Sequence, residues 1–132
     1  MLHHVSLGVT DLQRAARFYD AVLGPLGFVR VWSDFDGDPD SQAVGYGRPG
    51  GGDKLALKQR STGRLAPGPG FHLAFTAPSR AAVDAFHANA LHLGGTDNGA
   101  PGLRPHYGPN YYAAFVIDLD GYPVEAVINS GG

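Results

Sequence analysis

The stretch HVSLGVTDLQRAARFYDAVLGPLGF, residues 4–28, has a counterpart later in the chain, HLAFTAPSRAAVDAFHANALHLGGT, residues 72–96. The two stretches align without a gap, so that His4 meets His72. Identity is low, but both read as a short apolar strand, a turn, an amphipathic helix and a glycine. The repeat predicts a chain built from two copies of one supersecondary unit.

Each copy contains one predicted helix, because apolar residues recur there at helical spacing. Asp11 or Thr10 is expected to cap the first helix and Ser79 the second, while Gly24 and Gly94 are the expected ends. The apolar positions are Leu12, Ala15, Ala16, Tyr19, Val22 and Leu23 in the first copy and Ala82, Val83, Phe86, Ala90 and Leu93 in the second.

Three short strands are predicted to follow each helix. The stretches are FVRVWS, SQAVGYG and DKLALKQ in the first copy, and TDNGAPGLRPHY (weak), NYYAAFVID and YPVEAVIN in the second. The predicted fold class is therefore α+β, with two tandem βαβββ modules whose curved mixed sheets line a cleft. We expect a single domain, with module 1 at about residues 1–60, a Gly- and Pro-rich joint at 61–70 and module 2 at 71–132.

Composition excludes several function classes. The chain has 132 residues, a net charge of -2 and no cysteine. Scattered basic residues predict no nucleic-acid partner and no membrane surface. The lack of cysteine excludes disulfides and thiolate chemistry. No apolar run approaches the roughly 20 residues that span a bilayer, so we expect a soluble, cytoplasmic protein.

Strand alternation places three polar side chains on one side of the sheets. In the first and fifth strands, residues such as Leu7 and Leu73 must face the helix, which turns His4 and His72 to the opposite face. The same alternation turns Glu125 of the last strand toward the cleft. Two imidazoles and one carboxylate suit Zn²⁺, Fe²⁺, Mn²⁺, Ni²⁺ or Co²⁺, and such a set leaves positions open for substrate.

A metal-free interpretation remains open for the same residues. His4 and His72 would then be half-buried strand histidines, and Glu125 would form an ion pair with Lys54 or Lys58 across the cleft.

The chain resembles the vicinal oxygen chelate superfamily, which includes glyoxalase I, extradiol dioxygenases and bleomycin-type resistance proteins. The resemblance is carried by HHVSLGVTDLQRAARFYDAVLGPLGF, GFHLAFTAPSRAAVDAFHANALHLGG and YYAAFVIDLDGYPVEAV. The segments GTDNGAPGLRPHY and PNYYAAF are similar to a poorly defined glyoxalase-like branch.

The resemblance implies metal ligands on the first and last strands of each module. His4, His72 and Glu125 fall on three of these four positions, and we expect Lys54 at the fourth. A protonated lysine cannot ligate a cation, so three protein ligands are predicted. The resemblance also implies a homodimer.

The resulting hypothesis is a glyoxalase-like lyase or isomerase that binds a divalent metal and a small oxygenated substrate. The expected catalytic residues are Glu125, Tyr111 and His106, and the expected substrate-binding residues are Lys54, Arg104, Tyr107, Tyr112 and Trp32. One alternative is an extradiol-type dioxygenase that uses Fe²⁺ or Mn²⁺. The other is a non-catalytic protein that binds an aromatic or antibiotic ligand between Trp32, Phe35, Tyr46 and Tyr112.

Overall fold

The protein folds as two βαβββ modules, as the repeat predicts. The structure, a computed structural model, describes residues 1–63, 65 and 67–130. Module 1 contains β1 (Val5–Val9), α1 (Leu12–Leu23), β2 (Val29–Asp34), β3 (Ala43–Gly47) and β4 (Leu55–Gln59), with short 3-10 helices at Gly24–Leu26 (η1) and Pro39–Ser41 (η2). Module 2 contains β5 (Leu73–Thr76), α2 (Arg80–His92), β6 (Thr96–Leu103), β7 (Tyr112–Ile117) and β8 (Pro123–Ile128).

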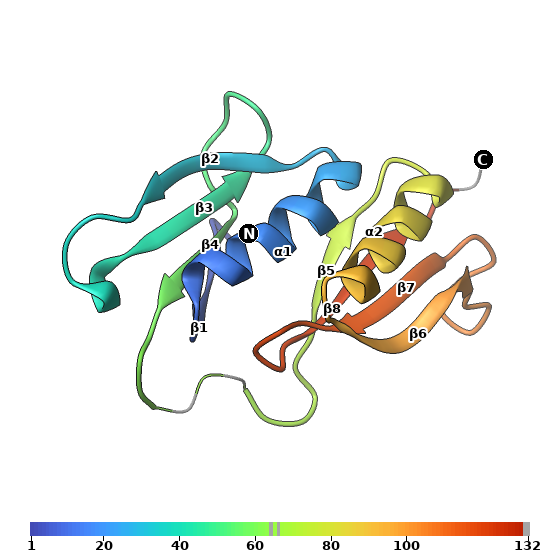
Figure 1. The fold of residues 1–132 in the computed structure, drawn as a ribbon. Helices are drawn as coiled ribbons and strands as arrows, with labels where there is room; N and C mark the ends of the chain where they lie inside the picture. Colours follow the sequence, from blue (N-terminus) through green and yellow to red (C-terminus); the bar gives the residue numbers. More distant parts are fainter. Residues whose placement is uncertain (64, 66, 131–132) are drawn as a thin grey trace.

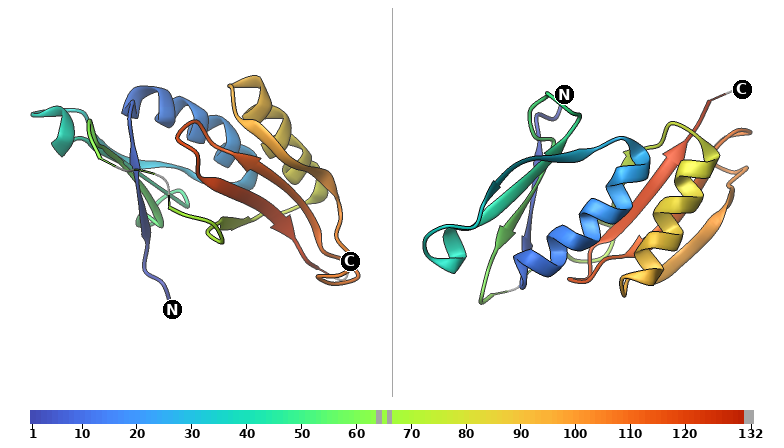
Figure 2. Two further views of the ribbon diagram at one scale, coloured as in Figure 1. Left: turned by 90° about the horizontal axis from the view of Figure 1, so that it is seen from below. Right: turned by 45° about the horizontal axis from the view of Figure 1, so that its top comes forward.

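Each module forms its own mixed four-stranded sheet. The strand orders are β1-β4-β3-β2 and β5-β8-β7-β6, and only the first and last strand of each module pair in parallel. The two helices run side by side and pack against each other, while each also covers the sheet of its own module (Figure 1, Figure 2). The opposite face of each sheet is therefore left without a helix.

Capping residues define where both helices begin. The Asp11 side chain accepts the Arg14 N–H at 3.1 Å, and the Ser79 hydroxyl accepts the Ala82 N–H at 3.1 Å. These contacts satisfy backbone donors that have no partner within the first turn.

α1 ends where expected, with Gly24 as its C-cap, but the backbone does not turn left-handed at that glycine. Gly24 has a right-handed φ of −53°, and the chain continues through η1 to Gly27, whose φ of 92° stops it. Pro25 explains the extension, because proline fits the start of a helical turn and Gly27 then supplies the left-handed backbone. Gly94, with a φ of 96°, follows α2.

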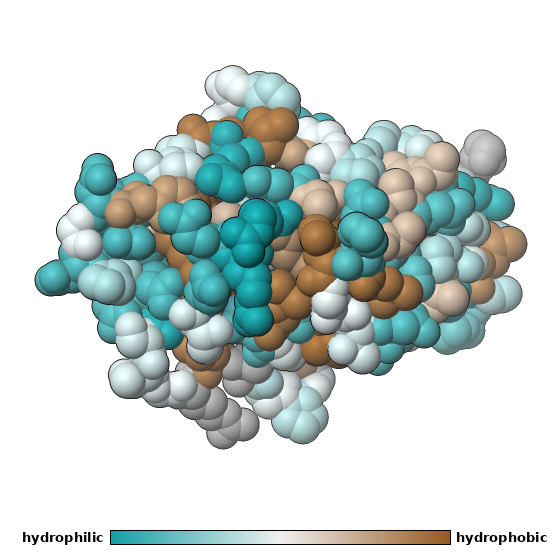
Figure 3. All heavy atoms as spheres, in the orientation of Figure 1, coloured by the Kyte–Doolittle hydropathy of each residue, from teal (hydrophilic) through white to brown (hydrophobic). Residues whose placement is uncertain are grey.

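The predicted apolar helix positions form the core. Those of α1 are all buried, and those of α2 are buried except Leu93, which lies beyond the helix end and is 37% exposed. The outward side of α1 carries hydrophilic residues (Figure 3). Within the described part of the chain, no helix has the length and apolar character needed to span a membrane.

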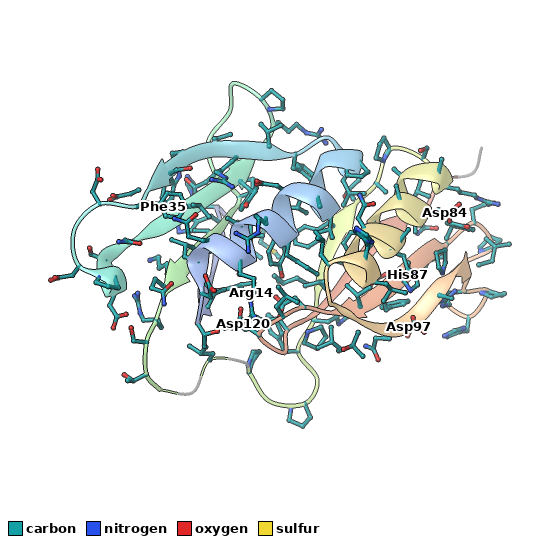
Figure 4. All side chains as sticks on the ribbon, in the orientation of Figure 1. Arg14, Phe35, Asp84, His87, Asp97 and Asp120 are labelled. Atoms are coloured by element: carbon teal, nitrogen blue, oxygen red, sulfur yellow. The ribbon has the colours of Figure 1, made fainter. Side chains whose placement is uncertain are left out.

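A buried carboxyl group ties module 2 to module 1. The Tyr19 hydroxyl of α1 donates to Asp118 Oδ2 at 2.5 Å, and Asp118 Oδ1 accepts the N–H groups of Asp120 and Tyr122. Asp120, labelled in Figure 4 near the start of α1, accepts the Thr10 hydroxyl at 2.8 Å. The β7–β8 turn is thus fastened to the helix of the other module.

Asp118 should make the stability of the fold depend on pH. Burial raises its pKa above the ordinary value of 3.8, despite hydrogen bonds that act in the opposite direction. At pH values between the ordinary pKa and the raised pKa of Asp118, the folded state binds more protons than the unfolded state. The free energy of unfolding therefore falls as pH rises through this range. Asp118→Asn should remove this component. Urea unfolding of both proteins from acid to neutral pH tests it, and parallel pH profiles would contradict it.

Candidate functional site

Glu125 lies at the centre of the module 2 sheet, on the face opposite α2. Strand pairing places Ala74, Glu125, Phe115 and Gly99 in one row across β5, β8, β7 and β6. Glu125 is nevertheless only 1% exposed. A carboxylate buried this deeply needs partners, because desolvation of an unpaired charge is costly.

Two side chains supply those partners. Glu125 Oε1 lies 3.0 Å from His72 Nε2, and the Tyr111 hydroxyl donates to Glu125 Oε2. The His72 side chain is 52% exposed, so this edge of the group opens to solvent. Burial, together with the Glu125 contact, raises the pKa of Tyr111 to about 12. The hydroxyl therefore stays protonated and keeps donating at neutral pH.

An aromatic cleft of about 620 Å³ surrounds the His72–Glu125 pair. Four aromatic residues, Phe71, Tyr107, Tyr111 and Phe115, are among its lining residues, as is Asn98. Neither Phe71 nor Phe115 nor Asn98 was expected here from the sequence. Phe115 was accessible to prediction, because it is the direct cross-strand neighbour of Glu125.

The turn after β6 carries three of the predicted residues. The Arg104 guanidinium donates to the carbonyls of Ala100 and Gly102 and lies 5.3 Å over the Phe115 ring. The exposed His106 ring is 4.1 Å from the Tyr107 ring. Tyr107 therefore lines the cleft directly, whereas Arg104 and His106 do not line it: Arg104 stacks on Phe115, and His106 packs against Tyr107.

His4 lies outside this cleft. It lines a separate cavity of about 250 Å³ between the modules, together with Lys54 and Leu73, and its Nδ1 is 2.8 Å from that of His3. Among the residues that the structure describes, no three His, Cys, Asp or Glu side chains gather as a metal site. One chain thus brings together His72, Glu125 and Tyr111, but not His4.

The position equivalent to Glu125 in module 1 is Ala56, which corrects the assignment of Lys54. Ser6 pairs with Ala56 exactly as its repeat partner Ala74 pairs with Glu125. Lys54 lies on the same face, two residues earlier and just before β4 begins. Alternation identified the face correctly, but the register along the strand depends on the pairing with β1. The fourth ligand position therefore holds a methyl group.

The aromatic set proposed for ligand binding does not share one cleft. Trp32 lies over Gly45 on the module 1 sheet and is 39% exposed. Tyr112 faces the helix side, because its hydroxyl donates to Asp84 of α2 at 2.6 Å. Asp84 is labelled on α2 in Figure 4. Tyr46 likewise faces α1, since its hydroxyl donates to the Ala16 carbonyl.

Comparison with known proteins agrees with this architecture. The sequence model of the Glyoxalase/Bleomycin resistance protein/Dioxygenase superfamily matches residues 1–126. The chain belongs to this superfamily. No curated protein sequence matches it. Superfamily membership establishes the fold and the class of proteins, but it leaves the activity and the substrate to be argued from the site.

Solved structures from the superfamily show the same fold. A glyoxalase/bleomycin resistance protein from Albidiferax ferrireducens T118 is 31% identical, with a TM-score of 0.75 over 96% of this chain and 97% of that one. A V278E mutant of glyoxalase I from Zea mays is 23% identical, with a TM-score of 0.74 over 94% of this chain and 44% of that one. A glyoxylase/bleomycin resistance protein/dioxygenase domain from Frankia sp. EAN1pec is 22% identical, with a TM-score of 0.70 over 98% of each chain.

The pKa of the Tyr111 hydroxyl should be measurable directly, because it is raised to about 12. Its pKa of about 12 lies above the ordinary value of 10.0 because of burial and the adjacent carboxylate. In an absorbance titration of the tyrosinate band, Tyr111→Phe should remove a component near pH 12. Loss of a component near pH 10 instead would contradict the contact with Glu125.

Proposed function

We propose that this protein is a glyoxalase-like, metal-dependent enzyme of the lyase or isomerase type, acting on a small oxygenated substrate. The observation that carries the proposal is the His72–Glu125 pair, buried at one end and open to a cleft at the other. A buried carboxylate beside an imidazole contributes little net stability, because desolvation offsets much of the attraction. A functional role accounts for the pair better than a structural one.

His72 Nε2 and Glu125 Oε1 are within hydrogen-bond distance of each other, and this separation is also compatible with two ligands of one six-coordinate cation. Two ligands at right angles, each about 2.1 Å from a metal, lie about 3.0 Å apart. His72 Nε2 and Glu125 Oε1 have this separation. Imidazole nitrogen and carboxylate oxygen also suit the borderline cations Zn²⁺, Fe²⁺, Mn²⁺, Ni²⁺ and Co²⁺. The donor set therefore fits a metal, with two ligands from module 2.

The third ligand in this proposal is His4 of a second copy of the chain. Within one chain His4 lies outside the cleft, so the set of three needs another molecule. The edge strands β1 and β5 end their sheets, and an unpaired strand edge is a natural surface for association. A symmetric homodimer would form two equivalent sites, each with module 1 of one copy facing module 2 of the other.

The metal would supply Lewis-acid stabilisation of a developing oxyanion. Glu125 would be the proton carrier in this scheme once its Oε1 is released from the metal. Tyr107 and Phe115 would hold the substrate body in the cleft, and Lys54 of the second copy would stabilise negative charge beside His4. Ala56 leaves room for substrate oxygen where a fourth protein ligand would otherwise stand.

The aromatic wall of the cleft favours a second candidate function, the non-catalytic binding of an aromatic or antibiotic ligand. Four rings line the cleft around a single buried carboxylate. Such a surface binds planar molecules by stacking without help from a cation. The two candidates differ in whether ligand binding needs a metal.

Removal of either module 2 ligand should strongly weaken metal binding. His72→Ala and Glu125→Gln should each weaken Mn²⁺ or Zn²⁺ affinity by more than about 100-fold. Loss of a residue that only hydrogen-bonds to a metal ligand would have a smaller effect. His92→Ala, which changes an exposed histidine at the end of α2, is the matched control. Titration calorimetry on chelator-treated protein measures the affinities.

Two outcomes would decide against the enzyme. Wild-type protein that binds no divalent metal contradicts the proposal. Aromatic ligand binding that survives chelator treatment, with no metal-dependent turnover, supports the binding protein instead.

Complementation tests the shared site. His4→Ala and Glu125→Gln should each be inactive alone, because every site in either homodimer lacks one ligand. After subunit exchange, each mixed dimer contains one intact site, so about one quarter of the sites should recover. Metal stoichiometry and activity of the mixture report the recovery. A mixture that stays inactive despite verified exchange would show that His4 does not serve the partner's site.

A further inference from the structure

The two oxygens of the Glu125 carboxylate have different neighbours. Oε1 lies beside His72 Nε2 from the segment before β5, whereas Oε2 accepts the Tyr111 hydroxyl from the segment before β7. Glu125 is 1% exposed, so the carboxylate has little freedom to turn. One oxygen therefore faces the open imidazole, and the other is occupied by a phenol.

The Tyr111 side chain is held in place by its own loop. The Arg104 N–H donates to the Tyr111 carbonyl at 2.8 Å, and the Tyr111 N–H donates to the Gly108 carbonyl at 3.3 Å. The Tyr107 ring packs 5.2 Å from the Tyr111 ring. These contacts fix the phenol before any ligand enters the cleft, so its hydrogen bond is a preorganised feature of the site.

We propose that Tyr111 is a positioning residue that makes Glu125 a one-oxygen ligand. This inference rests on the proposed metal site. While the hydroxyl donates to Oε2, only Oε1 can reach a cation beside His72. A carboxylate without such a donor can bind a cation through both oxygens.

The consequence is an additional open position for substrate. On a six-coordinate cation, three protein ligand atoms leave three positions to water or substrate, whereas a two-oxygen glutamate would leave two. The hydroxyl thus preserves space for a substrate that binds through two oxygens and a water beside it. The role of Tyr111 is exerted through Glu125, not by contact with the reacting atoms.

Counting the water molecules on bound Mn²⁺ tests the proposal. The water-proton relaxation enhancement per bound Mn²⁺ should fall by about one third in Tyr111→Phe, because Glu125 Oε2 displaces one of three waters on a six-coordinate ion. Tyr112→Phe is the matched control, since its hydroxyl donates to Asp84 on the other face of the sheet. It should retain the wild-type enhancement. A general loss of structure would alter both variants or lower the melting temperature.

A second measurement needs no variant. Difference infrared spectra of wild-type protein with and without Mn²⁺ should show a wide separation of the carboxylate stretching bands, which is typical of one-oxygen coordination. A narrow separation would overturn the proposal, as would a Tyr111→Phe variant with unchanged relaxation enhancement. If wild-type protein binds no Mn²⁺ or other divalent metal, the proposed function itself fails. Metal binding with unchanged water count leaves that function standing and removes only the role of Tyr111.

Discussion

Parallel pairing of the first and last strands in each module governs where the functional side chains lie. These two strands are far apart in the sequence and meet only because a helix and two further strands bring the chain back. In module 2 the pairing of Ala74 with Glu125 sets the carboxylate diagonally next to His72. In module 1 the same pairing sets Ala56 opposite Ser6. The two modules therefore share one scaffold, but only module 2 has a carboxylate at this position.

Burial of charge marks the site more clearly than the histidines do. Among the described residues, Asp118 and Glu125 are the buried charged side chains. Asp118 is surrounded by backbone donors and Tyr19, and it joins two modules, so its role is structural. Glu125 instead meets a half-exposed imidazole at the edge of a cleft. For Asp118, tertiary hydrogen bonds offset the cost of desolvating the carboxyl group. For Glu125, the same cost accompanies a site that is open to ligand.

The packing of α1 against α2 determines how the two sheets relate within one chain. The modules pack together through their helices (Figure 2), and within one chain His4 and Glu125 line two separate cavities. That arrangement separates the predicted ligands and makes a second copy part of the proposed site. It also explains why the aromatic wall comes from module 2 alone, with Phe71, Tyr107 and Phe115 around a single carboxylate.

The sequence by itself determined the two-module fold, both helices, the succession of strands along the chain and the face on which His72 and Glu125 lie. These properties follow from local periodicity and from the repeat, which act over a few residues at a time. Only the tertiary structure decided the rest. Strand register moved the fourth ligand position from Lys54 to Ala56, a hydrogen bond to Asp84 turned Tyr112 away from the cleft, and helix packing separated His4 from Glu125. Register and packing depend on contacts between residues distant in the chain, and a local pattern contains no information about those contacts.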